Sequence, residues 1–252
     1  MSAREPRGQS VLRIVSLFPA LLGTYGDGGN VLILAQRARW RGQAVEVISV
    51  DGDDPVPSSG DIYVIGGGED GSQLAAMAAL TSNGRQASQL GSLAGHAQIL
   101  AVCAGLQLLG EWFLDGAGDR TPGLGLLDAQ TSRLRRRAVG EVIATPAPSL
   151  GLPVLSGFEN HAGHTVLGPG VQPLATVVRG TGNGPSPTGA PATEGALTGS
   201  IIGTYLHGPL LARNPDLADL LIARATGGTV AQLSPVDVPE HAALRKRLGV
   251  AG

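Results

Sequence analysis

Residues 98–110 read QILAVCAGLQLLG, and this stretch decides the fold expected for the chain. An apolar run leads into the only cysteine, Cys103, and a helical pattern follows after the small residues Ala104 and Gly105. This order is typical of a strand, a sharp turn and a helix, and a nucleophile on such a turn lies exposed at the carboxyl end of a sheet. The positive end of the following helix favours an anionic sulfur. Cys103 is therefore a candidate nucleophile, although a lone cysteine is often a buried core residue.

Strand and helix patterns alternate through the first half of the chain. Apolar runs predict strands at 11–18, 44–50, 61–65 and 98–102. Helical periodicity predicts helices at 31–41, from about 72, and at 85–94. Strands that alternate with helices at this spacing favour a parallel sheet with helices on both faces. We therefore expect an α/β fold with three layers and a mostly parallel sheet.

The second half carries shorter and less regular patterns. Strands are predicted at 140–145, 153–158, 172–179 and 200–207, and helices at about 214–226 and at 239–248. Residues 180–199 are rich in Gly, Pro, Thr and Ser, which favours a flexible loop or hairpin tip. No repeat or linker divides the sequence. We expect one domain over residues 1–252, with its core at about 13–226 and a helical tail at 239–248.

The composition excludes several classes of protein. A net charge of −2 over 252 residues gives no basic surface for nucleic acid or an acidic membrane. A single cysteine excludes an internal disulfide and fits a reducing compartment. Residues 1–10 are polar without the apolar run of a signal peptide, and residues 11–22 are too short to span a bilayer. We expect a cytoplasmic protein without membrane insertion.

Two further strand ends offer groups that could assist Cys103. Residues 66–68 are three glycines that follow the predicted strand 61–65, and glycines there let backbone N–H groups approach a substrate oxyanion. His207 ends the predicted strand 200–207, where it could act as a general base on the same rim of the sheet. Alone, these features also fit an ordinary turn and a packed histidine. Together they supply a nucleophile, a base and backbone donors.

Five motifs give the chain a strong resemblance to a known enzyme family. They are residues 25–30 (YGDGGN), 66–70 (GGGED), 102–107 (VCAGLQ), 157–165 (GFENHAGHT) and 203–211 (GTYLHGPLL). With these motifs the chain resembles class I glutamine amidotransferases of the cobyric-acid-synthase-like branch. Within that branch it is similar to the GatD-type glutaminase subunits of lipid II isoglutaminyl synthases. The motifs and their flanking elements span residues 13–222.

The resemblance implies a flavodoxin-like fold and a glutaminase mechanism. Cys103 would attack the side-chain amide of L-glutamine, and His207 would carry the proton. Backbone amides at Gly67 and Ala104 would hold the oxyanion. Ammonia would pass to a Mur-ligase-like synthetase of the MurT type, which would amidate the α-carboxylate of D-glutamate in lipid II. This chain would need no cofactor, whereas the partner would use ATP and Mg²⁺.

The basic run at residues 133–137 supplies the expected substrate-binding arginine. Relatives place one arginine here against the α-carboxylate of glutamine, a task that suits a planar guanidinium, and Arg137 matches that position best. The alternative is a solvated basic run. His161 and His164 lie in the fourth motif without a Cys or carboxylate cluster at metal-ligand spacing. We expect no metal site, and a structural or interface role for these two histidines.

The sequence leaves open which group orients His207. Many class I members carry a glutamate two residues after this histidine, where the chain has Pro209. Without an orienting carboxylate an imidazole can adopt the wrong tautomer, so we expect the partner subunit to supply one and to raise glutaminase turnover. The rival candidates inside the chain are Glu69, Asp70 and Glu159.

Two other functions stay open at this point. The chain could be the amidotransferase component of a cobyrinate-type amidation, or a non-catalytic scaffold of the same fold that only binds a partner. No P-loop for ATP is present, so either amidation needs a separate synthetase. The presence of both Cys103 and His207 argues against the scaffold.

Overall fold

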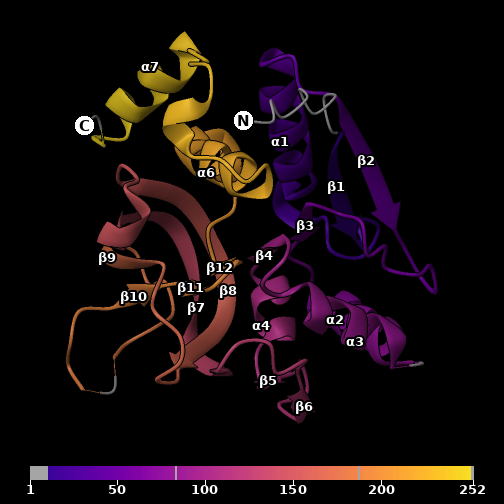
Figure 1. Ribbon diagram of the computed structural model, residues 1–252. Helices are drawn as coiled ribbons and strands as arrows, with labels where there is room; N and C mark the ends of the chain where they lie inside the picture. Colours follow the sequence, from indigo (N-terminus) through magenta and orange to yellow (C-terminus); the bar gives the residue numbers. More distant parts are fainter. Residues whose placement is uncertain (1–10, 83, 187, 251–252) are drawn as a thin grey trace.

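The computed structural model describes residues 11–82, 84–186 and 188–250, which form two six-stranded sheets with helices packed around the first (Figure 1). The polar segment 1–10 lies outside the described residues. Within those ranges, none of the helices is both long and apolar enough to cross a lipid bilayer. A bridge between Phe158 and His207 connects the two sheets.

The first sheet confirms the mostly parallel sheet expected from the sequence. Its strands, in spatial order, are β11 (Ala196–Thr198), β12 (Ile201–Thr204), β4 (Gln98–Val102), β3 (Ile62–Ile65), β1 (Leu12–Leu17) and β2 (Val45–Val50). All neighbours pair in parallel except β11, which runs antiparallel to β12. The five parallel strands have the order of flavodoxin-like folds, in which ligands bind at the carboxyl ends.

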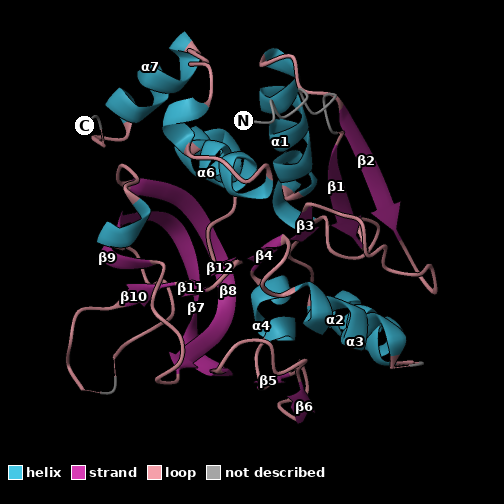
Figure 2. Ribbon diagram, viewed as in Figure 1, coloured by secondary structure: helices cyan, strands magenta, loops and turns pink. Residues whose placement is uncertain are grey.

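Helices cover both faces of this sheet (Figure 2). On one face lie α1 (Gly28–Trp40) and α6 (Pro215–Ala225), and on the other lie α2 (Asp70–Thr81), α3 (Arg85–Leu93) and α4 (Ala104–Leu109). Every residue of β3 and β4 is buried, as strands between two helical layers must be. The remaining helical segments are α5 (Leu210–Arg213), α7 (Pro239–Arg247) and the short turns Thr24–Gly26, Pro148–Leu150 and Val230–Gln232.

A buried ion cluster joins α1 to α6. The Asp219 carboxylate accepts from Arg37 at 2.7 Å and from Arg41 at 2.7 Å, and all three side chains are almost fully buried. Two guanidinium groups around one carboxylate satisfy the charges that burial would otherwise leave unpaired. The cluster therefore fixes the position of α6 relative to the helix that follows β1.

The second sheet is larger than the sequence analysis predicted. Its strands are β5 (Trp112–Leu114), β6 (Arg120–Pro122), β7 (Ala129–Pro146), β8 (Leu155–Leu167), β9 (Ala175–Arg179) and β10 (Thr193–Glu194). The predicted strands 140–145 and 153–158 are only parts of β7 and β8. The basic run belongs to β7, where all four arginines are exposed and the in-out alternation is lost over residues 135–137, and the register with β8 shifts between Arg133 and Ala138. Arg137 lies within this bulge, and its side chain reaches the hydroxyl of Tyr25, which belongs to the segment after β1.

Residues 180–199 were predicted to form a flexible loop, and much of this segment is ordered by buried polar groups instead. Asn183 donates from its side chain to the Gly195 carbonyl at 2.8 Å and accepts from the Gly195 amide at 2.9 Å. The Glu194 carboxylate accepts from the Thr204 hydroxyl and from the Tyr205 amide. These bonds fasten β10 and β11 to the end of β12.

Candidate active site

The carboxyl ends of four parallel strands meet at one edge of the first sheet. The segment after β1 carries Asp27, β3 runs into the three glycines at 66–68, Cys103 follows β4, and His207 lies three residues beyond β12. Because parallel strands present their carboxyl ends on one side, groups up to 180 residues apart in sequence come together here. The meeting of Cys103 and His207 at this edge agrees with the sequence analysis.

Cys103 lies on the predicted turn between a strand and a helix. Its backbone has φ 53° and ψ −104°, a left-handed conformation that costs energy for a residue with a side chain. The Cys103 amide donates to the Thr204 carbonyl at 2.7 Å, which fixes the turn to the strand that leads to His207. A Cβ on Gly105 would lie 2.6 Å from the Ile65 carbonyl oxygen, so only glycine lets α4 pack this closely on β3. The strain therefore resides at the candidate nucleophile.

Asp27 is the group that orients His207. Both Asp27 carboxylate oxygens lie 3.0 Å from His207 Nδ1, and both side chains are fully buried. This pairing leaves Nε2 on the other side of the ring, buried and without a hydrogen-bond partner among the described residues. Burial lowers the pKa of His207, but the hydrogen-bonded Asp27 carboxylate and the neighbouring Cys103 outweigh burial and raise that pKa to about 10. The site thus holds an imidazolium between a carboxylate and the Cys103 sulfur.

The expectation that the partner must supply this carboxylate is wrong for the described geometry. None of the three rival carboxylates contacts His207 either: Glu69 accepts from Tyr25, Asp70 pairs with Arg133, and Glu159 accepts from the Thr181 and Gly182 amides. Sequence reasoning used residues 25–30 only as a family signature. Asp27 directly precedes the helix that follows the first strand, and this position could have identified it as a candidate for orienting His207.

Gly67 lies against both Cys103 and His207. A Cβ placed on Gly67 would lie 2.8 Å from His207 Cε1 and 3.2 Å from Cys103 Cβ, so a side chain would force the two apart. The Gly67 amide donates to Asp27 Oδ2 at 2.8 Å. This bond corrects the sequence prediction, because an amide already used by Asp27 is not free to bind an oxyanion. Gly67 supports the carboxylate instead.

Two other residues with backbone amides line the pocket next to Cys103. Ala104 opens α4, so its N–H has no acceptor inside the helix. Gly68 lies one residue beyond Gly67, and both Gly68 and Ala104 line the pocket that contains Cys103. Gly68 and Ala104 are therefore the candidates for the role that the sequence analysis assigned to Gly67 and Ala104.

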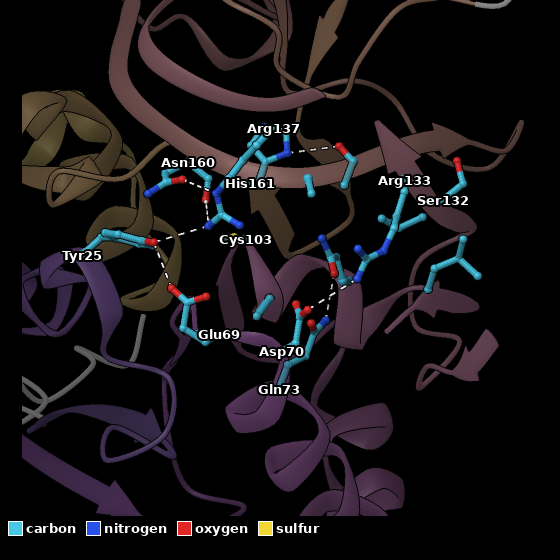
Figure 3. A pocket seen from close by; sticks show the side chains of 17 residues that line it. Tyr25, Glu69, Asp70, Gln73, Cys103, Ser132, Arg133, Arg137, Asn160 and His161 are labelled. Atoms are coloured by element: carbon cyan, nitrogen blue, oxygen red, sulfur yellow. Dashed lines mark hydrogen bonds and ion pairs between the residues drawn. The ribbon is translucent and has the colours of Figure 1, made fainter. Parts of the chain in front are cut away.

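The pocket beside Cys103 is lined by charged and polar side chains from the second sheet and from the turns and helices that follow strands of the first (Figure 3). Its charged members are Glu69, Asp70, Arg133 and Arg137. Of the basic run, Arg133 and Arg137 line the pocket, whereas Arg135 and Arg136 are not part of its lining. Arg137 therefore lies where the sequence analysis expected a substrate-binding arginine, and Arg133 is its only rival from the run.

The two arginines differ in their partners. Arg133 donates to the Asp115 carbonyl at 2.6 Å and pairs with the Asp70 carboxylate at 3.4 Å. Arg137 donates only to neutral oxygens of Asn160, at 2.6 Å and 3.3 Å, and to the Tyr25 hydroxyl at 3.4 Å. Its guanidinium has no carboxylate partner among the described residues. Arg137 is thus the arginine of the pocket with an uncompensated positive charge.

The histidines of the fourth motif have structural contacts. His161 is buried and stacks on Tyr205 with ring centroids 3.8 Å apart, and its Nδ1 lies 3.1 Å from the Gly163 carbonyl oxygen. His164 Nε2 lies 3.1 Å from the Pro185 carbonyl oxygen. Among the described residues, no group of three His, Cys, Asp or Glu side chains is arranged to hold a metal ion.

Comparisons with known proteins agree with this arrangement. Residues 13–215 match the sequence profile of the CobB/CobQ-like glutamine amidotransferase domain. The chain is 32% identical over 228 residues to the GatD subunit of the glutamine-hydrolysing lipid II isoglutaminyl synthase of Streptococcus pneumoniae, covering 89% of this chain and 84% of that protein. For the corresponding GatD of Staphylococcus aureus the identity is 30% over 227 residues, covering 90% and 89%.

More distant relatives share the family or only the fold. A cobyric acid synthase of Sphingopyxis alaskensis is 33% identical over 187 residues, which cover 71% of this chain and 35% of that enzyme. A crystal structure of a glutamine amidotransferase superposes with a TM-score of 0.57 at 18% identity, covering 84% of this chain and 98% of that one, and this likeness concerns the fold alone. From its profile match and its relatives, the chain belongs to the CobB/CobQ-like glutamine amidotransferases.

Proposed function

We propose that this chain is the glutaminase subunit of a lipid II isoglutaminyl synthase. It hydrolyses L-glutamine to glutamate and ammonia, and the ammonia amidates lipid II on a synthetase partner during peptidoglycan synthesis. The observation that carries the hydrolytic step is the set Cys103, His207 and Asp27 at one sheet edge, beside a pocket that contains Arg137. The relatives named GatD, which match about nine-tenths of the chain, support the choice of pathway.

In the first chemical step, the Cys103 thiolate attacks the δ-carbon of glutamine. The tetrahedral oxyanion accepts hydrogen bonds from the amides of Ala104 and Gly68, because Gly67 is bonded to Asp27. His207 then donates its Nε2 proton to the leaving nitrogen, so that ammonia departs and a thioester remains. Asp27 holds the ring through Nδ1 during this transfer.

In the second step, water hydrolyses the thioester. Neutral His207 removes a proton from water, hydroxide adds to the carbonyl, and the Cys103 thiolate leaves as glutamate forms. The imidazolium and thiolate pair is thereby restored. Arg137 binds the α-carboxylate throughout, because its guanidinium is the one in the pocket without an acidic partner among the described residues.

The acceptor half of the reaction belongs to the partner. A Mur-ligase-like synthetase of the MurT type would use ATP and Mg²⁺ to activate the α-carboxylate of D-glutamate in cytoplasmic lipid II, and ammonia would attack it there. Co-purification of this chain with such a synthetase, followed by amidation of lipid II by the complex, tests this part. Recovery of a cobyrinate-type synthetase instead would favour the alternative amidation.

The hydrolytic proposal is tested with Cys103→Ser. We expect loss of glutamine hydrolysis with an unchanged melting temperature, since a hydroxyl in this place ionises far less readily than a thiol. Ser132→Ala, a change of similar size in the pocket lining, serves as the control for handling and folding. Substantial turnover by Cys103→Ser would remove Cys103 from the role of nucleophile.

A further inference from the structure

The four charged side chains of the pocket fall into two pairs with different surroundings. Asp70 and Arg133 form an ion pair at 3.4 Å and neutralise each other. Glu69 and Arg137 have opposite charges too, but within the described part of the chain neither has a charged partner. The pocket therefore presents one uncompensated carboxylate and one uncompensated guanidinium.

Tyr25 holds these two groups at a fixed spacing. Its hydroxyl donates to Glu69 Oε1 at 3.0 Å and accepts from Arg137 Nη2 at 3.4 Å (Figure 3). Burial, and then the neighbouring Glu69 carboxylate, raise the pKa of Tyr25, so the hydroxyl keeps the proton that it donates. Glu69 and Arg137 consequently lie on either side of the Tyr25 hydroxyl oxygen. Their separation suits a ligand that carries an ammonium group and a carboxylate on the same carbon atom.

The Glu69 side chain is not used for capping the helix that it precedes. Glu69 is the N-cap residue of α2, yet its side chain makes no capping hydrogen bond. Figure 3 shows it directed toward Tyr25, with Arg137 beyond the same hydroxyl. Because the Glu69 carboxylate does not cap α2 and faces the pocket, it is available for a ligand.

We propose that Glu69 binds the α-ammonium group of glutamine while Arg137 binds its α-carboxylate, with Tyr25 setting the distance between them. This inference rests on the proposed glutaminase function and adds a specificity site to it. A zwitterionic α-carbon fits between the two charges, and the side chain of the bound glutamine would extend to Cys103, which lines the same pocket. Charge-assisted hydrogen bonds on both sides select a free amino acid over an amide without an α-ammonium group.

The test compares two substrates that differ only at the α-carbon. Glutaramate has the amide and the carboxylate of glutamine but lacks the amino group. With the full-length protein and its synthetase partner, we expect Glu69→Gln to lower kcat/KM for L-glutamine roughly 10–100-fold and to leave kcat/KM for glutaramate unchanged within about twofold. Asp70→Asn makes the matched carboxylate-to-amide change one residue away, and we expect it to keep the wild-type preference for glutamine.

A second readout needs no turnover. 6-Diazo-5-oxo-L-norleucine carries the α-amino acid group of glutamine; its diazo carbon takes up a proton, and the Cys103 sulfur then displaces N₂. We expect Glu69→Gln to slow this labelling by a similar factor, whereas labelling by iodoacetamide, which has no α-amino acid group, keeps its wild-type rate.

The outcomes separate the two proposals. Equal losses for glutamine and glutaramate would overturn the ammonium site and make Glu69 a support for Tyr25 alone. If Asp70→Asn, and not Glu69→Gln, abolished the preference for glutamine over glutaramate, Asp70 would bind the ammonium group and the Glu69 site would be overturned. If the wild-type protein hydrolyses no glutamine but is still labelled by the norleucine analogue in a Glu69-dependent manner, the proposed function fails and the amino acid site stands.

Discussion

Replacement of Asp27 by asparagine should remove most of the glutaminase activity while the protein stays folded. The carboxylate contacts His207 Nδ1 through both oxygens at 3.0 Å and accepts from the Gly67 amide at 2.8 Å. An amide side chain can accept through only one atom and presents an N–H₂ group through the other. Either the Gly67 amide or the imidazole then faces a donor, and the ring is free to adopt the wrong tautomer.

The size of the effect follows from these contacts. Loss of the orienting carboxylate costs about 10⁴ in turnover in a serine protease, and a thiol, which ionises more readily, should lose less. We expect kcat to fall by about 10²–10⁴. In the wild type the pKa of His207 is about 10 because Asp27 and Cys103 outweigh burial. Without the charge of Asp27, burial gains weight and the imidazolium that stabilises the thiolate is depleted at neutral pH.

Two measurements check the prediction for Asp27→Asn. Glutaminase turnover is measured with and without the synthetase, and the rate of Cys103 alkylation by iodoacetamide is followed from pH 6 to pH 10. Asp70→Asn is the matched control in the same pocket. The free energy of unfolding should fall by no more than about 1–3 kcal/mol, the cost of one unsatisfied buried donor. Turnover near the wild-type value, or full rescue by the partner, would refute the assignment of Asp27.

Three further changes test other parts of the molecule. Arg137→Ala should raise KM for glutamine by roughly 10–100-fold, because a hydrogen bond to a charged group contributes about 1.5–3 kcal/mol. Arg136 lies outside the pocket, so Arg136→Ala should leave KM unchanged. A larger effect of Arg133→Ala would show that Arg133 binds the α-carboxylate instead. Burial raises the pKa of Glu194 from 4.5 to about 7, so the wild type loses up to about 3 kcal/mol of stability as pH rises from 4.5 through 7. Glu194→Gln should lack this loss in denaturation measured at pH 4 and pH 8, and parallel curves would contradict it. Asp219→Ala leaves two guanidinium groups buried without a counterion and should destabilise the protein by about 3–5 kcal/mol in urea unfolding, whereas a loss below about 1 kcal/mol would mean that water reaches them.

The first sheet could be predicted closely from the sequence. β3 and β4 are short apolar runs buried on both faces, and β1, β3 and β4 are each followed by a helical pattern, so periodicity locates them. The short edge strand β11 was missed because it lies in the Gly- and Pro-rich segment 180–199. The second sheet could be predicted only in part, because β7 carries exposed charged residues and β8 alternates buried with half-buried positions, so neither is a continuous apolar run. The four arginines at residues 133–137 look like a solvated run, yet they lie in a strand whose order comes from 12 paired positions with β8.

The candidate site divides in the same way. Cys103 and His207 could be found because each follows a strand, and parallel strands bring their carboxyl ends together. The contact between Asp27 and His207 joins residues 180 positions apart, and no local pattern specifies which carboxylate reaches the ring. The Gly67 amide was expected to bind an oxyanion for the same reason. A glycine looks the same in the sequence whether its amide is free or, as here, donates to Asp27.

The bulge in β7 has a consequence for how this site can diversify. In a regular antiparallel pair, adding or losing one residue turns every later side chain to the opposite face, which would ruin the buried half of β7. At residues 133–137 the register with β8 is already broken, so an insertion or deletion there is absorbed locally. The side chain at position 137, which we propose binds the α-carboxylate of glutamine, can therefore be exchanged by evolution or by a protein engineer without moving Cys103, His207 or Asp27, which follow strands of the other sheet.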